Sequence, residues 1–185
     1  MFVSDSGISR IYRVFPGGGL DPEFNMPELD PMTKKPLLKE PESMVLYRDK
    51  LLVASEGTGD IRIFDRRSGK PDGPRYIFGA EIFSGDVEGL AVTGDYLFAV
   101  DVNNTRIAVF DLGSETPRFL MGFVSDHESA DGIAVDPTGK YVAIADQGNS
   151  RIVLYNLEEI MNYLAQAQAE VQGSKLQSST SPSQP

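Results

Sequence analysis

The 185-residue sequence contains no cysteine, which excludes a disulfide framework, a thiolate metal site and a cysteine nucleophile. It also contains only one histidine, His127, and no serine lies in a Gly-x-Ser-x-Gly motif. The sequence therefore gives little support to nucleophilic catalysis. We expect His127, which lies in the polar loop Ser125–Ser129, to be a surface residue.

Basic residues are scarce as well: 17 Lys and Arg stand against 27 Asp and Glu, for a net charge of -10. A protein that binds nucleic acid needs a basic surface to displace counterions, so we expect no nucleic-acid partner. No apolar run approaches the roughly 18 residues of a membrane-spanning helix, so we expect no membrane span. Acidity of this strength favours solubility, or cation binding where carboxylates converge.

What the sequence does contain is a repeat. Four similar segments each carry an isoleucine near the start of a short apolar strand: Ile11, Ile61, Ile107 and Ile152, separated by 50, 46 and 45 residues. Upstream of each lies another short strand that ends near an acid. A period of about 40–50 residues with three or four short strands is typical of a β-propeller blade. We therefore predict an all-β propeller of about four blades.

The blade units that this repeat predicts are residues 1–15, 42–79, 86–124 and 131–156. The first unit is incomplete, because it lacks the acid-led strand that opens the others. Propellers typically have 4–8 complete blades, so we expect this chain to be the C-terminal part of a larger propeller, or an internally started reading frame. The chain shows no signal peptide, but a truncated parent could be secreted, so the sequence leaves the compartment undetermined.

Three segments lie outside the blades. Residues 16–41, rich in glycine and proline, are expected to form an insertion loop at a blade edge: an irregular surface loop or, alternatively, a lid over the channel. Residues 157–171 have helical periodicity and are expected to pack on the side of the propeller. Residues 172–185, rich in Ser, Gln and Pro, are expected to be disordered.

Acids precede the first strand of three units, as Glu42, Glu88 and Asp131. The innermost strands of a propeller run along its channel, so we expect these positions to form a ring at one mouth. Converging carboxylates repel one another unless a cation neutralises them. Oxygen ligands with loose geometry suit Ca²⁺, whereas Zn²⁺ prefers His and Cys, so the site predicts calcium. A structural role for these acids remains the alternative.

A second set of acids ends the second strand of each unit, and we align Asp5, Glu56, Asp101 and Asp146 at this position. Such acids bind a cation in one interpretation. In the other they accept hydrogen bonds from turn amides, or pair with an arginine of the next strand. The sequence offers Arg106 as the partner of Asp101 and Arg151 as the partner of Asp146.

Basic side chains gather in the second unit. Arg62, Arg66 and Lys70 are the candidates for binding a phosphate group of a substrate, and Lys50, Arg67 and Arg75 lie near them in the sequence. The alternative is that these residues form the solvated face of a strand.

Two family resemblances follow from these motifs. The segments Val100–Ile107 and Ala145–Ile152 resemble NHL repeats, whose blades carry Val-Ala-Asp followed by Asn-Arg-Ile. The wider range 42–160 resembles β-propeller phytases. That resemblance is carried by the segments Asp86–Leu90, Ser125–Ile133, Ala145–Asn149, Tyr155–Ile160, Ala54–Gly57 and Phe64–Arg66.

The phytase resemblance implies calcium ligands at Glu88, Asp131, Asp146, Gln147 and Glu42. It implies calcium-dependent hydrolysis of a phosphomonoester, such as an inositol phosphate, by the full-length parent. The NHL resemblance implies instead a non-catalytic propeller that is a scaffold for a protein ligand. A third alternative is a lactonase-type propeller, for which Asn103 and Asn149 would be metal ligands. The expected partner is thus a small phosphate ester or a protein.

Overall fold

A computed structural model describes residues 1–123 and 128–179, and within them the strands form four antiparallel sheets, as the repeat predicts. The order of strands in the two complete sheets is β3-β4-β5-β6 and β7-β8-β9-β10, and it follows the chain order. The sheet at the amino end has the order β1-β2, and the sheet at the carboxyl end has the order β11-β12-β13. Each sheet is a blade, and we number them one to four along the chain.

The bounds of the strands of the first two blades are β1 Phe2–Asp5, β2 Arg10–Arg13, β3 Pro41–Tyr47, β4 Lys50–Ser55, β5 Asp60–Asp65 and β6 Ile77–Phe78. Those of the last two are β7 Val87–Thr93, β8 Tyr96–Asp101, β9 Arg106–Asp111, β10 Arg118–Phe123, β11 Ala130–Val135, β12 Tyr141–Asp146 and β13 Arg151–Asn156. The fourth strands that the sequence predicts at 75–78 and 119–123 thus occur as β6 and β10.

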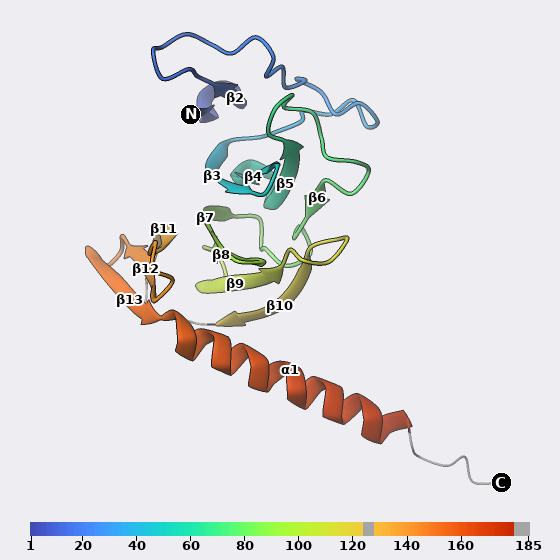
Figure 1. Cartoon of the computed structure of the whole chain (residues 1–185), viewed down its shortest axis with the longest axis vertical. Helices are drawn as coiled ribbons and strands as arrows, with labels where there is room; N and C mark the ends of the chain where they lie inside the picture. The colour runs from blue at the N-terminus through green and yellow to red at the C-terminus, as the bar shows by residue number, and fades with distance from the viewer. Residues whose placement is uncertain (124–127, 180–185) are drawn as a thin grey trace, which may run out of the picture.

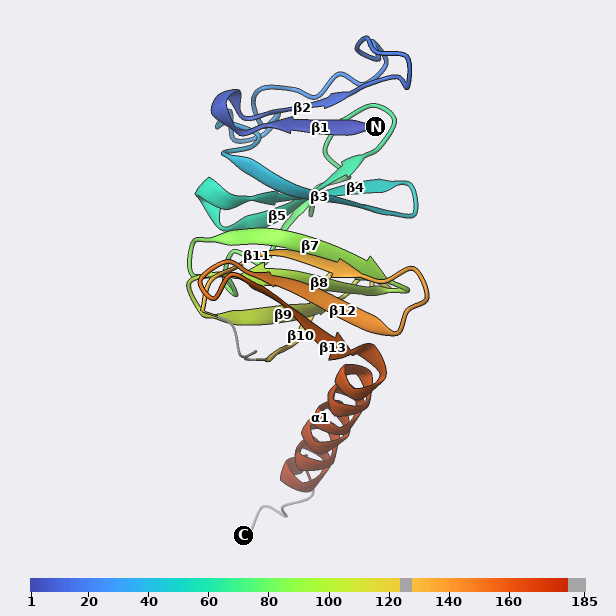
Figure 2. The same cartoon turned by 90° about the vertical axis from the view of Figure 1, so that its left-hand side faces the viewer.

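The four blades are arranged as a fan around one side of the molecule, where β3, β7 and β11 are neighbours (Figure 1). Figure 2, which looks at this side, shows the sheets in chain order from the amino end to the helix. Strand β7 packs against both β3 and β11, so these three strands are the innermost of their blades. The outermost strands, β6 and β10, lie away from this inner side (Figure 1).

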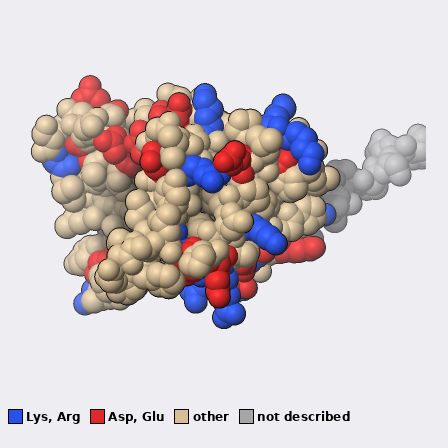
Figure 3. Space-filling model, turned by 90° about the horizontal axis from the view of Figure 1, so that it is seen from above, with Lys and Arg blue, Asp and Glu red and all other residues tan. Residues whose placement is uncertain are grey.

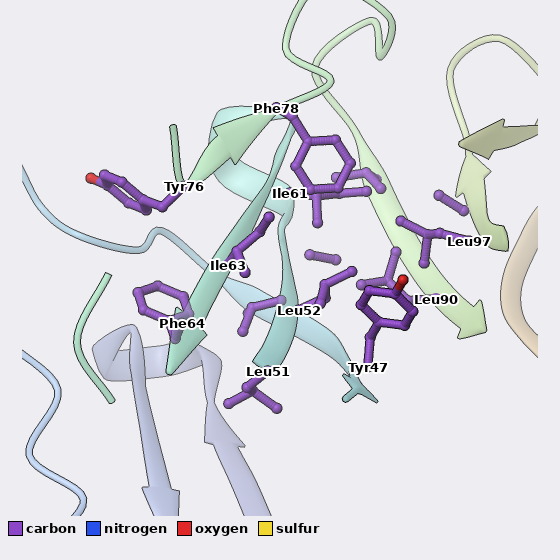
Figure 4. Packing of buried hydrophobic residues seen from close by; sticks show 14 of the residues in the cluster. Tyr47, Leu51, Leu52, Ile61, Ile63, Phe64, Tyr76, Phe78, Leu90 and Leu97 are labelled. Atoms are coloured by element: carbon purple, nitrogen blue, oxygen red, sulfur yellow. The ribbon is translucent and has the colours of Figure 1, made fainter. Parts of the chain in front are cut away.

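The blades hold together by packing face to face. Residues 51–54 of β4 and 97–100 of β8 are all fully or almost fully buried, because each of these strands has a neighbouring blade on both sides. Alternate side chains of a strand point to opposite faces, which explains why these strands are apolar at every position. Figure 4 shows Leu52 and Ile61 of the second blade opposite Leu90 of the third.

The loop 16–40 adds to this core, which goes beyond the surface loop expected from the sequence. Its side chains Phe24, Met26, Leu37 and Leu38 are buried in the cluster shared by the first three blades. The hydroxyl of Tyr76 donates a hydrogen bond to Asp30 of the loop, and this bond raises the pKa of Tyr76 to about 13 together with the burial of the ring, so the tyrosine stays protonated.

Helix α1, Leu157–Ser179, follows the last strand and contacts β13 and β10. Its residues Leu157, Ile160 and Leu164 are buried against the third and fourth blades, on the face that the periodicity predicts. The helix is longer than the expected 157–171, since no proline occurs before Pro182 to interrupt its hydrogen bonds. Residues 180–185 lie outside the described part.

The surface agrees with the composition. On the face seen in Figure 3, Lys and Arg are scattered among Asp and Glu and form no continuous basic patch. Among the described residues, no helix is both long and apolar enough to span a bilayer.

The second and third blades approach each other most closely through two glycines. Gly59 has a φ of +61°, and a Cβ atom added to it would lie 2.5 Å from the Cα atom of Gly85. Gly59 closes the 3₁₀ turn Glu56–Thr58, and Gly85 directly precedes Asp86. The absence of a side chain at Gly59 therefore allows Glu56 and Asp86 to come together.

We predict that Gly59→Ala destabilises the protein more than Gly73→Ala, which is a matched control. Gly73 also has a positive φ, +76°, but a Cβ there would meet nothing within 4 Å. The control should cost about 1 kcal/mol for the backbone conformation alone. The clash at Gly59 should add about 1–3 kcal/mol. Urea unfolding of both variants measures the difference, and equal losses of stability would contradict the close approach.

Candidate metal centre

The candidate site lies where the three innermost strands begin. Glu42 of β3, Glu88 of β7 and Asp131 of β11 each occupy a β-bulge, at the register shifts 41/44, 87/90 and 130/132. The three acids thus hold matching positions in their blades, in agreement with the repeat. Bulges occur at functional sites, where they redirect a side chain out of the regular alternation of a strand.

The bulges leave backbone groups that neighbouring blades satisfy. The Leu90 amide, at the end of the β7 bulge, donates a hydrogen bond of 3.0 Å to the hydroxyl of Ser43 in the β3 bulge. This contact fastens the innermost strands of the second and third blades next to Glu42 and Glu88. A shallow groove of about 320 Å³ runs past it, lined by Glu42, Glu88, Asp131 and their neighbours.

Three carboxylates come closest together at this mouth: Glu56, Asp86 and Glu88, each of which offers an oxygen within 4.8 Å of the others. All three side chains are partly buried. Glu56 comes from the second blade and Asp86 and Glu88 from the third, so the packing of the two blades creates the group. We call Glu56, Asp86 and Glu88 the acidic trio.

Burial and mutual repulsion raise the pKa values of the trio. The pKa of Glu88 is raised to about 7, first by burial and then by the charges of Asp131 and Asp86. Burial, followed by the charges of Asp86 and Glu42, raises the pKa of Glu56. The pKa of Asp86 is also raised, by burial and then by Asp101 and Asp131. The site therefore resists holding its full negative charge without a cation.

One atom of the trio also lacks a hydrogen-bond partner. The Asp86 Oδ1 atom is buried and accepts no hydrogen bond from any group in residues 1–123 and 128–179. A buried carboxylate oxygen without a donor is costly. A hard cation such as Ca²⁺, which takes 6–8 oxygen ligands at 2.3–2.6 Å, would satisfy this atom and neutralise the trio. The residues present therefore fit a calcium ion.

Asp101 and Asp146, by contrast, have partners within the fold. The Asp101 carboxylate is fully buried and accepts from Arg106 Nε at 2.7 Å and from Asn104. Asp146 accepts in the same way from Arg151 Nε at 2.8 Å and from Asn149. Burial raises the pKa of Asp146, but these bonds and those from backbone amides outweigh it and hold the pKa far below its usual range. Both acids match the pairing alternative given above.

The alignment of Glu56 with these acids is wrong by one residue. Ser55 pairs with Asp60 across the hairpin, as Asp101 pairs with Arg106 and Asp146 with Arg151. Ser55 therefore occupies the structural position, and Glu56 opens the following 3₁₀ turn and is free to join the trio. The sequence motif could have indicated Asp86, because Asp86 and Glu88 flank the buried Val87 and so point to the same side.

The remaining predicted ligands lie apart from the trio. Gln147 is exposed in the β12–β13 turn, where its backbone amide donates to Ser129, and with Asp131 and Asp146 it lines a separate hollow on the last blade. Asn149 binds Asp146, and Asn103 donates to the Ser84 carbonyl. His127, Ser125 and Asp126 lie outside the described residues.

The predicted phosphate-binding side chains do not meet the acids either. Arg62 is buried, and its guanidinium binds Asp60 at 2.7 Å and the carbonyl of Leu37. Arg66 and Lys70 are exposed in the turn after β5. Because β5 begins at the acidic mouth, this turn lies at the opposite end of the blade.

We predict that Glu88→Gln reduces the pH dependence of stability. Glu88 binds a proton more tightly in the folded protein, so its contribution is present below pH 4.5 and is lost as the pH rises through about 7. With allowance for solvent screening, the loss should be about 1 kcal/mol. Urea unfolding at pH 5 and pH 8 without divalent ions measures it in both proteins. Identical changes in the two proteins would contradict the raised pKa.

Comparison with known proteins adds the fold but no family. No protein-family model matches the chain, and no curated protein is significantly similar in sequence. A chain from the crystal structure of a nidogen/laminin complex matches with a TM-score of 0.61 at 18% identity, over 85% of this chain and 55% of that one. A Bacteroides fragilis protein described as a 6-phosphogluconolactonase matches with a TM-score of 0.55 at 15% identity, over 63% and 35%. This chain thus spans between a third and rather more than half of those chains, and its fold is that of a β-propeller.

Proposed function

We propose that the acidic trio binds Ca²⁺ and that the propeller uses this ion to hold and hydrolyse a phosphomonoester, as the resemblance to β-propeller phytases implies. The observation that carries the proposal is the trio itself: three carboxylate oxygens within 4.8 Å, one on an Asp86 side chain whose Oδ1 has no donor in the described chain. Calcium would supply positive charge for these carboxylates and for the phosphate oxygens.

The side chains of the chain have distinct tasks in this proposal. Glu56, Asp86 and Glu88 would hold the ion, and Glu42 and Asp131 would extend the negative surface along the groove. Glu88, whose pKa is about 7, would change protonation state near neutral pH and could accept a proton in the groove. The Ser43–Leu90 hydrogen bond keeps the two blades in register beneath these groups.

A non-catalytic binding propeller of the NHL type is the second candidate. The positions of Arg62, Arg66 and Lys70 favour it, because none of these cations shares the mouth with the trio. In that case a calcium ion would stabilise the mouth, and the propeller would present a surface to a protein ligand.

We predict that Ca²⁺ raises the melting temperature of the protein through the trio. At 100 times the dissociation constant, binding to the folded state adds about 2.7 kcal/mol. For a chain of this length this corresponds to a rise of about 5–10 °C. Glu88→Gln should remove most of the rise, whereas Glu115→Gln, the same change at an exposed acid at the other end of the third blade, should leave it intact. Differential scanning calorimetry at 0–10 mM CaCl₂ gives the answer, and the absence of any shift would end the metal proposal.

The hydrolytic part of the proposal has its own test. With Ca²⁺ present, the chain should release phosphate from inositol hexakisphosphate, and Glu88→Gln should reduce the rate at least tenfold relative to Glu115→Gln. Phosphate release is measured colorimetrically at pH 7. A calcium-dependent melting shift without any phosphate release would leave the cation site standing and favour the binding propeller.

A further inference from the structure

The last blade presents an apolar face that the matching positions of other blades bury. Ile152 pairs with Ala145 across its hairpin, as Ile107 pairs with Val100 and Ile61 with Ala54. Ile61 and Ile107 are fully buried against the next blade, whereas Ile152 is 64% exposed. Leu154, two residues further, is 63% exposed, although its counterparts Ile63 and Val109 are buried. The face that points onward along the chain order therefore has no blade packed on it.

This onward face is apolar across all three strands. Ala145 lies opposite Ile152, Ala143 lies opposite Leu154, and Gly132 and Ala134 of β11 continue the two rows. Tyr141 borders them and is 47% exposed. A contiguous apolar surface of this kind marks a protein interaction site.

The first blade has the complementary surface on its other side. Counting back from the pairs Asp5–Arg10 and Asp101–Arg106, Val3 matches Ala99 and Met1 matches Leu97. Ala99 and Leu97 are fully buried in the core that the third blade shares with the second. Met1 is 76% exposed and Val3 40%, because no blade lies behind them.

We propose that a second copy of this chain covers both faces, with the last blade of each copy packed on the first blade of the other. The contact would repeat, at matching positions, the packing that joins successive blades within the chain. A head-to-tail contact of this type closes into a ring if the rotation permits. Two copies of four blades would make eight, the upper end of the usual range of blade numbers. The proposal does not depend on the calcium site.

The length of the chain favours a second copy as the occupant. The chain covers 55% of the propeller-containing chain that it matches over 85% of its own length, so two copies provide about the material of one such structure. Helix α1 leaves the onward face open, since it contacts β13 and β10 through Leu157, Ile160 and Leu164, which are buried toward the third blade.

The test is the mass of the protein in solution. Sedimentation equilibrium at 1–100 µM should give twice the chain mass of 20.2 kDa. Leu154→Glu blocks the onward face and Val3→Glu the opposite one, and each should weaken the association at least tenfold while the far-UV circular dichroism stays unchanged. An equimolar mixture of the two variants retains one intact contact and should associate more tightly than either variant alone. Ile77→Glu, at a 40% exposed residue of β6, is the matched control and should remain a dimer.

Three outcomes would overturn the proposal. A monomer at 100 µM would mean that something other than a second copy covers the faces. A dimer that Leu154→Glu abolishes but Val3→Glu does not affect would mean that two onward faces pack on each other. A mass that grows without limit would mean that the head-to-tail contact forms an open filament and does not close.

Discussion

The face-to-face packing of blades is the constraint on which the rest of the structure depends. Because each middle blade is covered on both sides, its central strand must be apolar at every position, as in Leu97–Val100. The polar side chains are thereby confined to strand ends, bulges and turns. At one end of the second and third blades, the hydrogen bond between Ser43 and Leu90 fixes the contact. At the other end, the Tyr47 hydroxyl binds Asp95 of the third blade at 2.7 Å.

The acidic mouth is a consequence of this packing. No local feature of the sequence brings Glu56 near Asp86; the close approach of Gly59 and Gly85 does so when the two apolar faces meet. The fold then holds three carboxylates where burial and mutual repulsion raise their pKa values, and apolar packing must offset the cost. Asp101 and Asp146 show the contrast, since each is fully buried and yet fully paired with an arginine. Pairing inside the fold is therefore available to acids of this protein, and the trio lacks it.

Much of the fold could be predicted from the sequence, because the repeat is carried by local patterns. The spacing of Ile61, Ile107 and Ile152 identifies the hairpins, and the register confirms their equivalence. The position of Glu56 could not be predicted in this way, since the second blade places Ser55 where the third has Asp101. The packing of the long loop was also beyond the sequence, because the partners of Leu37 and Leu38 lie in other segments of the chain.

The basic residues show the same limit for the site. Arg62, Arg66 and Lys70 are close in sequence, but β5 carries them from the acidic mouth to the opposite end of the blade. Proximity along a strand of about 3.3 Å per residue is thus a poor guide to proximity at a site. Acids on different blades, 30 or more residues apart in sequence, meet more closely than these neighbours do.

The trio and the open faces are physically separable, although both arise from the blades. Glu56 and Asp86 belong to the second and third blades, whose mutual packing is complete within one chain. Asp131 of the last blade is the link, because it lines both the groove beside Glu88 and the hollow beside Ile152. The charge of Asp131 acts on the pKa of Glu88, whereas Glu56 responds chiefly to Asp86 and Glu42. Covering the last blade would therefore desolvate Asp131 and change the protonation of Glu88 more than that of Glu56, so the assembly would adjust the cation site through this one carboxylate.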